Sequence, residues 1–308
     1  MQIDNLKAFC MVVESGSISK AAKKLFVSQP SLSVKIQDLE NYYQAILLER
    51  TNKGVRPTDA GLVVYQNAQK IISLGDNIER QLEKTRSEEL ELVIGASSTI
   101  GNYALPCTIY NFKEKYPLYK LTLDISNSEH VVEKVIDGRV EIGLIEGPLS
   151  PSLRETLTRE GIGTKRVATN ALILVVHNNG RFADTESIDL EHAFRSLPLI
   201  VRETGSGIRT TLEMVLAAHG LKLDDLNVVL ELNTTNAIVS AVTSDKGVSL
   251  LPRMAIRKEL HYKILREITV NNTNFRHDIT TLYRTDNANK PLHATFLNFL
   301  HSRERGFC

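Results

Sequence analysis

Apolar residues recur every three or four positions along roughly the first sixty residues, a period that indicates short amphipathic helices. Helices are expected at 4–13, 18–25 and 29–43. In the third, Leu32, Ile36, Leu39 and Tyr43 share one face and form the predicted buried stripe. The second and third helices, joined by a turn at 27–28, predict a helix-turn-helix, with the first helix preceding it.

The opposite face of the third helix is short and polar near its N-terminal end. Ser28 is a suitable capping residue, and Pro30 lies in the first turn, where its missing N–H costs nothing. The start and the exposed face comprise Ser28, Gln29, Pro30, Ser31, Ser33, Val34 and Gln37. Amide and hydroxyl side chains in this position suit base edges in a DNA major groove. An ordinary helical hairpin with a solvated face fits the same pattern.

The segment 45–58 is short and basic. Arg50, Lys53 and Arg56 surround Gly54 and Pro57, which predicts a two-stranded wing lying along the phosphates of a duplex. The formal net charge of the chain is only +1, so any contact with DNA must come from a local basic cluster. Besides the wing, that cluster comprises Lys20, Lys23, Lys24 and Lys35.

A long amphipathic helix is predicted from Thr58 to Glu88. Thr58 and Asp59 form a capping signal, and apolar residues follow at alternating three- and four-residue steps. So long an apolar stripe beside a small domain must be buried, either against its own chain or against a partner.

After Glu88 the pattern changes to alternating strands and helices. Strands are expected at 90–96, 118–126, 141–145, 167–177, 199–202, 228–232, 248–252, 264–270 and 279–283. Helices are expected at 103–116, 129–137, 208–219, 235–243 and 292–303. This order predicts two α/β lobes with parallel strands, joined by two crossings, of which 264–270 is the return.

Polar, glycine-containing loops follow several of these strands. Ligands of open α/β sheets bind at the carboxyl ends of strands, so these loops are candidate ligand contacts. They contain Ser97, Ser98, Thr99, Ile100, Glu146, Gly205, Ser206, Gly207, Thr235 and Asn236. Hydroxyls and helix-start amides favour an anion. Ser and Thr at helix starts also serve simply as caps, which would leave the cleft empty.

Other classes of function have little support in the sequence. No nucleophile elbow, phosphate loop or paired metal motif occurs, so neither an enzyme nor a cofactor is expected. No signal peptide or membrane span is predicted. Cys10, Cys107 and Cys308 are few and far apart, which favours a reducing compartment, with Cys10 and Cys107 as packed thiols and Cys308 at a mobile end.

Four ordered motifs connect these observations. They are Ala21-Ala22-x-x-Leu25-x-x-Ser28-Gln29-Pro30-Ser31-Leu32-Ser33, then Leu39-Glu40, then Leu48-x-Arg50, then Thr58-Asp59-Ala60-Gly61. Together they resemble the winged helix-turn-helix of LysR-type transcriptional regulators. The two predicted lobes resemble the periplasmic-binding-protein fold of the sensor domain in that family, so the resemblance covers the whole chain. The hydroxyl-rich loops are similar to those of the branch that senses sulfur or carbon-assimilation metabolites.

The resemblance implies a domain order and a set of partners. It implies a DNA-binding domain at 1–58, a dimerisation helix at 59–88 and an effector domain at 89–308. Lobe I would comprise 89–163 and 268–308, and lobe II 164–267. The implied partners are double-stranded DNA with an interrupted two-fold promoter site, a small anionic metabolite, further copies of the chain in a homodimer or homotetramer, and RNA polymerase, in a bacterial cytoplasm without membrane attachment.

The sequence departs from the family pattern at the recognition helix. Val34 stands where members usually carry Arg or Lys, and Gln37 where they often carry a basic residue. The alternative function is a solute-binding α/β protein with a helical interaction domain. That alternative leaves the polar face at 28–33 and the basic wing unexplained.

Overall fold

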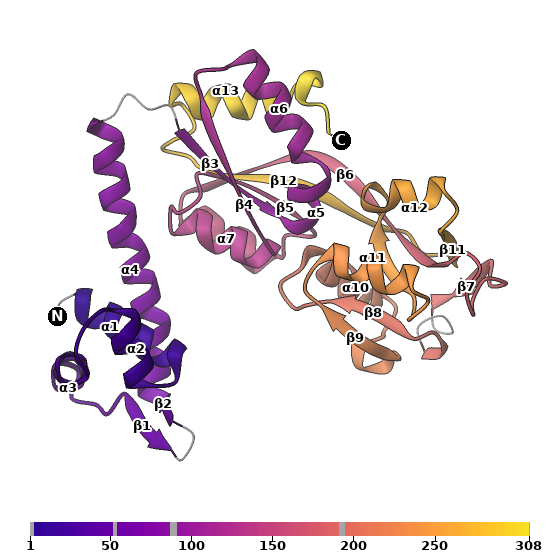
Figure 1. Ribbon diagram of the computed structural model, residues 1–308. Helices are drawn as coiled ribbons and strands as arrows, with labels where there is room; N and C mark the ends of the chain where they lie inside the picture. Colours follow the sequence, from indigo (N-terminus) through magenta and orange to yellow (C-terminus); the bar gives the residue numbers. More distant parts are fainter. Residues whose placement is uncertain (1–2, 52–53, 87–90, 191–194, 308) are drawn as a thin grey trace. The chain divides into compact units, whose positions relative to one another are not determined.

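The computed structural model describes residues 3–51, 54–86, 91–190 and 195–307, and it divides into two compact units, 1–88 and 89–308 (Figure 1). The first unit comprises α1 (Ile3–Ser15), α2 (Ile18–Lys24), α3 (Gln29–Tyr43), β1 (Leu48–Thr51), β2 (Gly54–Pro57) and α4 (Asp59–Arg86). The predicted helices and the two-stranded wing are therefore confirmed as elements. β1 and β2 pair antiparallel, with Leu48 opposite Pro57.

The core of the first unit joins all four helices. Phe9 of α1, Ala21 of α2 and Leu32 of α3 are fully buried together, and Ala68 of α4 packs into the same cluster. Part of the α4 stripe thus covers its own domain. Leu62, Val63, Leu74 and Ile78 on α4 remain exposed large apolar side chains.

Two of the sequence motifs fix the wing to the recognition helix. The Glu40 carboxylate of α3 accepts hydrogen bonds from the backbone N–H groups of Leu47 (2.8 Å) and Leu48 (3.2 Å). The Thr58 N–H donates to the Leu47 carbonyl at 3.0 Å. At Gly61, a Cβ atom would lie 2.0 Å from that same carbonyl oxygen, so only glycine lets α4 approach the wing this closely.

The second unit alternates strands and helices as predicted. Its first half comprises β3 (Glu91–Ser97), α5 (Ser98–Tyr103), α6 (Leu105–Lys115), β4 (Lys120–Ser126), α7 (Ser128–Ile136), β5 (Ile142–Glu146), α8 (Pro151–Arg159), β6 (Ile162–His177) and β7 (Ser187–Asp189). Its second half comprises β8 (Leu199–Arg202), α10 (Gly207–Ala218), β9 (Val228–Leu232), α11 (Thr235–Thr243), β10 (Ser249–Pro252), α12 (Arg257–His261), β11 (Leu265–Asn271), β12 (Phe275–Arg284) and α13 (Pro291–Leu300).

One sheet runs through this unit in the order β4-β3-β5-β12-β6-β11-β7, with β10 also paired to β6, while β8 and β9 form a separate parallel pair (Figure 1). β3 is parallel to both β4 and β5, which confirms the predicted βαβαβ order. Because these strands are parallel, the carboxyl ends of β3, β4 and β5 meet at one edge.

The prediction that 264–270 is the return crossing between the two lobes is wrong. β12 pairs antiparallel with β6 from Phe275 opposite Leu172 to Arg284 opposite Ile162, and it also pairs with β5. The segment expected to return, 264–270, is instead β11, which lies between β6 and β7. Both segments have strand-forming sequences, and only their long-range pairing distinguishes them. The helices α5 and α8 were not predicted.

The cysteine predictions have mixed outcomes. Cys10 is buried in α1, and burial, with the Glu14 carboxylate nearby, raises the pKa of its thiol to about 11. Cys107 is exposed and disulfide-bonded, so its prediction as a packed free thiol is wrong. Cys308 lies outside the described residues. Within the described ranges, no helix combines the length and the apolar character needed to cross a membrane.

Candidate functional site

The face of α3 predicted to contact DNA is exposed and held firmly. The Ser28 side chain caps the helix by accepting a hydrogen bond from the Ser31 N–H at 3.3 Å. Leu32, Ile36 and Leu39 are buried on the opposite face. The predicted contact residues Ser28, Gln29, Pro30, Ser31, Ser33 and Gln37 are all exposed, and Val34 is exposed among them. Side chains that are three or four positions apart in this set lie on the same stripe of the helix.

The structure describes the side chains of only some of the basic residues predicted to contact phosphates. Arg56 Nε lies 2.6 Å from Glu49 Oε1 across the wing, so its guanidinium has a partner within the chain. Both side chains are well exposed, at 70% and 45%, and such a pair breaks at little cost. Lys35 is half-buried. Lys53 and the side chain of Arg50 lie outside the described residues.

In the second unit, the predicted ligand residues at the end of β3 are buried. Ser97 is 1% exposed, and Ser98, Thr99 and Ile100 beside it are also buried. Within the described part of the chain, the hydroxyls of Ser97 and Ser98 have no hydrogen-bond partner. Ser97 precedes α5 but makes no side-chain cap bond. The interpretation of this hydroxyl as a helix cap is therefore wrong.

The start of α10 also carries a buried serine hydroxyl that does not cap its helix. Ser206 is 2% exposed, its hydroxyl makes no cap bond, and it too has no partner among the described residues. At α11 the cap is Thr234, whose hydroxyl accepts from the Ala237 N–H at 3.2 Å. Thr235 is therefore free of a capping role and faces inward.

A chain of hydrogen bonds connects the strand-end loops across the unit. The hydroxyls of Thr99 and Thr235 lie 3.2 Å apart, and Arg202 Nη1 donates to the Thr235 hydroxyl at 3.0 Å. The Tyr103 hydroxyl also contacts Asn236 Oδ1. Arg202 is 2% exposed and pairs with Glu203, with 2.7 Å between Nε and Oε2. Arg202 was not predicted, although a cation ending the apolar run 199–201 was a visible signal.

Glycines allow the closest approach between these loops. The Glu129 N–H donates to the Gly205 carbonyl at 3.1 Å, and Gly205 has φ +85°, which favours glycine. A Cβ atom at Gly207 would lie 1.7 Å from the Glu146 carbonyl oxygen. The structure thus places Gly207 against Glu146, and Gly205 against Glu129.

Glu146 forms a buried contact that the sequence did not predict. Its Oε2 lies 3.5 Å from His277 Nε2, and both side chains are 1% exposed or less. Since Thr211 donates its one hydroxyl proton to the Gly207 carbonyl (2.7 Å), the contact of 3.0 Å between Thr211 Oγ1 and His277 Nδ1 requires a proton on Nδ1.

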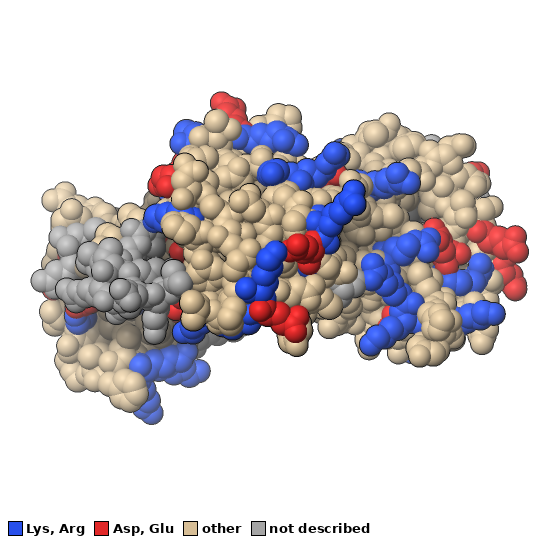
Figure 2. All heavy atoms as spheres, turned by 90° about the horizontal axis from the view of Figure 1, so that it is seen from above, with Lys and Arg blue, Asp and Glu red and all other residues tan. Residues whose placement is uncertain are grey.

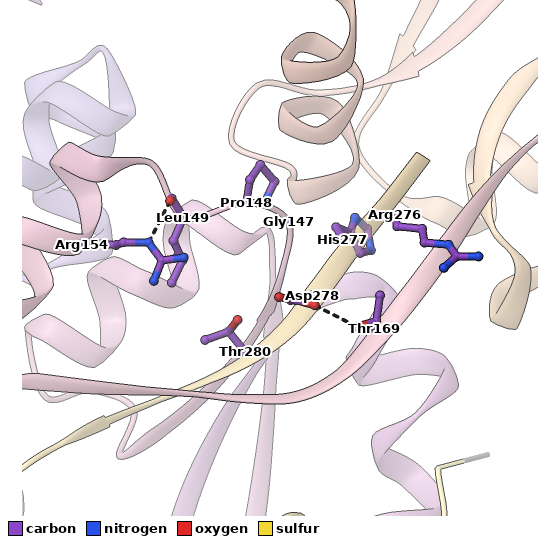
Figure 3. Close-up of a pocket in the computed structure, with 9 residues that line it drawn as sticks. All are labelled: Gly147, Pro148, Leu149, Arg154, Thr169, Arg276, His277, Asp278 and Thr280. Carbon is purple, nitrogen blue, oxygen red and sulfur yellow. Dashed lines mark hydrogen bonds between the residues drawn. The ribbon is translucent and has the colours of Figure 1, made fainter. Parts of the chain in front are cut away.

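A cavity of about 260 Å³ lies beside this pair (Figure 3). Its lining includes Gly147, His277 and the side chains of Thr169 and Asp278, which share a hydrogen bond of 2.8 Å. Arg154 enters from α8 and donates to the Leu149 carbonyl at 3.2 Å (Figure 3). None of the predicted hydroxyls lines this cavity.

Figure 2 shows the charged residues on one face of the molecule. There, Lys and Arg side chains of the second unit are interspersed with Asp and Glu. Among the described residues, no group of three or more His, Cys, Asp or Glu side chains could hold a metal ion. A winged helix-turn-helix followed by a two-lobed α/β domain with a polar junction defines a DNA-binding regulator with a sensor domain.

Comparison with known proteins identifies the family. A family model described as "LysR substrate binding domain" matches residues 85–305, and one described as "Bacterial regulatory helix-turn-helix protein, lysR family" matches residues 3–62. The chain belongs to the LysR family of transcriptional regulators. This confirms the resemblance and excludes the alternative of a solute-binding protein with an unrelated helical domain.

One relative and two solved structures illustrate the likeness. A "Probable RuBisCO transcriptional regulator" of Cyanidioschyzon merolae is 30% identical over 289 residues, which is 94% of this chain and 92% of the relative. Full-length CbnR complexed with its target DNA has a TM-score of 0.65 at 21% identity, covering 97% of this chain and 99% of that one. The CcmR regulatory domain of Synechocystis PCC6803 in complex with 2-PG has a TM-score of 0.59 at 19% identity, covering 68% and 95%.

Proposed function

We propose that this regulator binds a small anionic metabolite at the junction of β3, α5, α10 and α11, and that the ligand controls its action on DNA. The observation that carries the proposal is the set of buried hydroxyls of Ser97, Ser98 and Ser206, which have no partner in the described chain. Leaving a buried polar group unpaired costs about 1–3 kcal/mol. A ligand that accepts hydrogen bonds from these hydroxyls removes that cost.

The charge at the junction favours an anion. Arg202 is a buried guanidinium, and its hydrogen bond to Thr235 continues to Thr99. Hydroxyls polarised by a cation in this way make stronger hydrogen bonds to a negatively charged group. The carbon-assimilation branch is supported by the relative named for RuBisCO regulation and by the CcmR domain bound to 2-PG.

Calorimetric titration tests the site. The panel is sulfate, inorganic phosphate, 2-PG and small mono- and dicarboxylates, each titrated into the full chain. At least one should bind, and Thr99→Val and Ser206→Ala should each weaken it about tenfold, as expected for a lost hydrogen bond to a charged group. Thr158→Val, on the exposed face of α8, is the matched control and should bind like the wild type. Binding that survives both substitutions unchanged places the ligand elsewhere.

We propose that α3 enters the major groove, where Ser28, Gln29, Pro30, Ser31, Ser33 and Gln37 meet the bases and adjoining backbone. Lys35, Arg50, Lys53 and Arg56 would then contact phosphates. The exposed polar stripe on a helix anchored by Glu40 supports this placement. Sequencing the fragments selected from a random DNA pool tests it, because two such helices in a dimer require an interrupted two-fold site.

We propose a dimer through α4 and a tetramer through the effector domains, acting on RNA polymerase in the cytoplasm. The exposed Leu74 and Ile78 on α4 support the first interface. Met214 on α10, Val229 on β9 and Leu118 before β4 support the second, since they are exposed and apolar. Light scattering should give a dimer or tetramer, and a stable monomer at micromolar concentration would contradict both interfaces.

A further inference from the structure

Val34 carries an apolar side chain among the polar residues Ser33 and Gln37 on the exposed face of α3. Its side chain is 56% exposed. Pro30 lies one turn before it and Gln37 one turn after it, and Ser33 lies beside it, all of them exposed. These four positions therefore form one continuous stripe on the helix.

Folding of the domain does not account for this valine. The core positions of α3 are Leu32, Ile36 and Leu39, and Val34 is not part of the hydrophobic cluster that they join. A β-branched residue also lowers helix propensity relative to alanine. Neither burial nor helix formation favours valine here, whereas an apolar contact with a binding partner would.

We propose that Val34 reads the 5-methyl group of a thymine in the major groove. The inference rests on the proposed placement of α3 in that groove. Valine has no donor, acceptor or charge, so it can hold neither a phosphate nor a polar base edge. The thymine methyl is the apolar group that a base pair presents in the major groove, and apolar side chains recognise it by contact.

The position of Val34 in the helix supports this assignment. The residue lies in the first half of α3, which is the part of a recognition helix that reaches base edges. The neighbouring amides of Gln29 and Gln37 suit the N6 and N7 atoms of adenine. The three side chains together favour A·T pairs, so each half-site should contain a thymine at the position that faces Val34.

Deoxyuridine tests this contact because it differs from thymidine only by the missing methyl group. The site selected from the random pool is synthesised with each thymine in turn replaced by deoxyuridine, and the affinity of the full-length dimer is measured by fluorescence anisotropy. At one thymine per half-site, the replacement should weaken wild-type binding about fourfold, the value for one methyl group withdrawn from an apolar contact. Replacement in both half-sites should weaken binding by the product of the two single factors.

Val34→Ala removes both γ-methyl groups of the valine. The affinity of this variant should no longer depend on the replacement of thymine by deoxyuridine, since the two changes remove one shared contact. Val34→Thr keeps one methyl group and should keep part of the dependence. Ile264→Val, which removes a single methyl group from an exposed apolar side chain of the second unit, is the control and should respond to deoxyuridine like the wild type.

The outcomes separate the inference from the proposed function. If no site is selected from the pool, the proposed DNA contact of α3 itself fails. If a site is selected but no replacement weakens binding, Val34 does not read a methyl group. If a replacement weakens the wild type and Val34→Ala alike, another residue reads that methyl, and the inference is overturned.

Discussion

The two units of this regulator hold the polar groups of their proposed binding sites in opposite ways. Ser33 and Gln37 of α3 are exposed on a helix whose other face is packed. Ser97 and Ser206 of the effector domain are 1% and 2% exposed, and their hydroxyls have no partner in the described chain. The first surface is therefore complete before its partner arrives. The second must open before a ligand can reach it.

In both units, a glycine lets a helix lie very close to the backbone of a neighbouring segment, but the consequences differ. Gly61 lets α4 meet the wing, next to a backbone hydrogen bond that fixes the domain. Gly207 lets α10 meet Glu146, next to hydroxyls that are buried and unpaired. The first contact stabilises the exposed surface of the first unit, and the second closes the proposed effector site.

The largest expected effect is on the first unit. Gly61→Ala places a Cβ atom 2.0 Å from the Leu47 carbonyl oxygen and should lower the free energy of unfolding by about 3 kcal/mol, with loss of DNA binding. Gly75→Ala in the same helix meets only an ordinary contact of 3.6 Å and should raise it by about 0.5–1 kcal/mol. Urea denaturation of the two full-length variants measures both. Equal effects would contradict the tight approach at Gly61.

Removing a base contact should have the next largest effect. Gln29→Ala should cost about 1–3 kcal/mol at one base pair of the selected site and leave the preference elsewhere unchanged. Asp38→Asn, also exposed on α3, is the control and should change the affinity for all sequences alike. Anisotropy with single-base variants of the site measures the difference. A uniform loss for Gln29→Ala would remove Gln29 from the base contacts.

Blocking closure of the second unit should weaken the ligand about tenfold. Gly207→Ala places a Cβ atom 1.7 Å from the Glu146 carbonyl oxygen, which destabilises the closed arrangement. Ala217→Ser, at an exposed position of the same helix, should leave the affinity unchanged. Calorimetry with the anion found in the panel measures this. Tighter binding to Gly207→Ala would mean that the ligand prefers the open arrangement.

The smallest expected effect concerns the wing. Glu49→Gln frees the Arg56 guanidinium and removes one negative charge, so DNA affinity should rise about two- to threefold at low salt for every sequence. Arg56→Gln should lower it by a similar factor. The gain should vanish at high salt, where exposed charges are screened. An unchanged affinity for both variants would place Arg56 away from the phosphates.

The sequence predicted the first unit well because its signals are local. Helical spacing located Leu32, Ile36 and Leu39, and the motif from Thr58 to Gly61 located the start of α4. Tyr43, predicted in the same buried stripe, is exposed because it lies in the last turn of α3, beyond the packed part of the helix. The physical role of that motif, the approach to Leu47, needed the three-dimensional contact.

The second unit was predicted less completely because its decisive contacts are distant in the chain. The strand patterns located both β11 and β12, but they did not show that β12 is the strand that pairs with both β5 and β6. Arg202 and His277 were missed because a buried charged or titratable side chain is explained only by its partners, here Thr235 and Glu146.

Amide hydrogen exchange on the full-length chain tests the central contrast most directly. The Glu129 amide donates to the Gly205 carbonyl at the junction, and the Leu47 amide donates to Glu40 behind the wing. We expect Glu129 to exchange much faster than Ile94 in the central strand β3, and to slow when the anion is bound, while Leu47 does not change. If Glu129 exchanges as slowly as Ile94 both with and without the anion, the junction does not open, and the proposed effector site is contradicted.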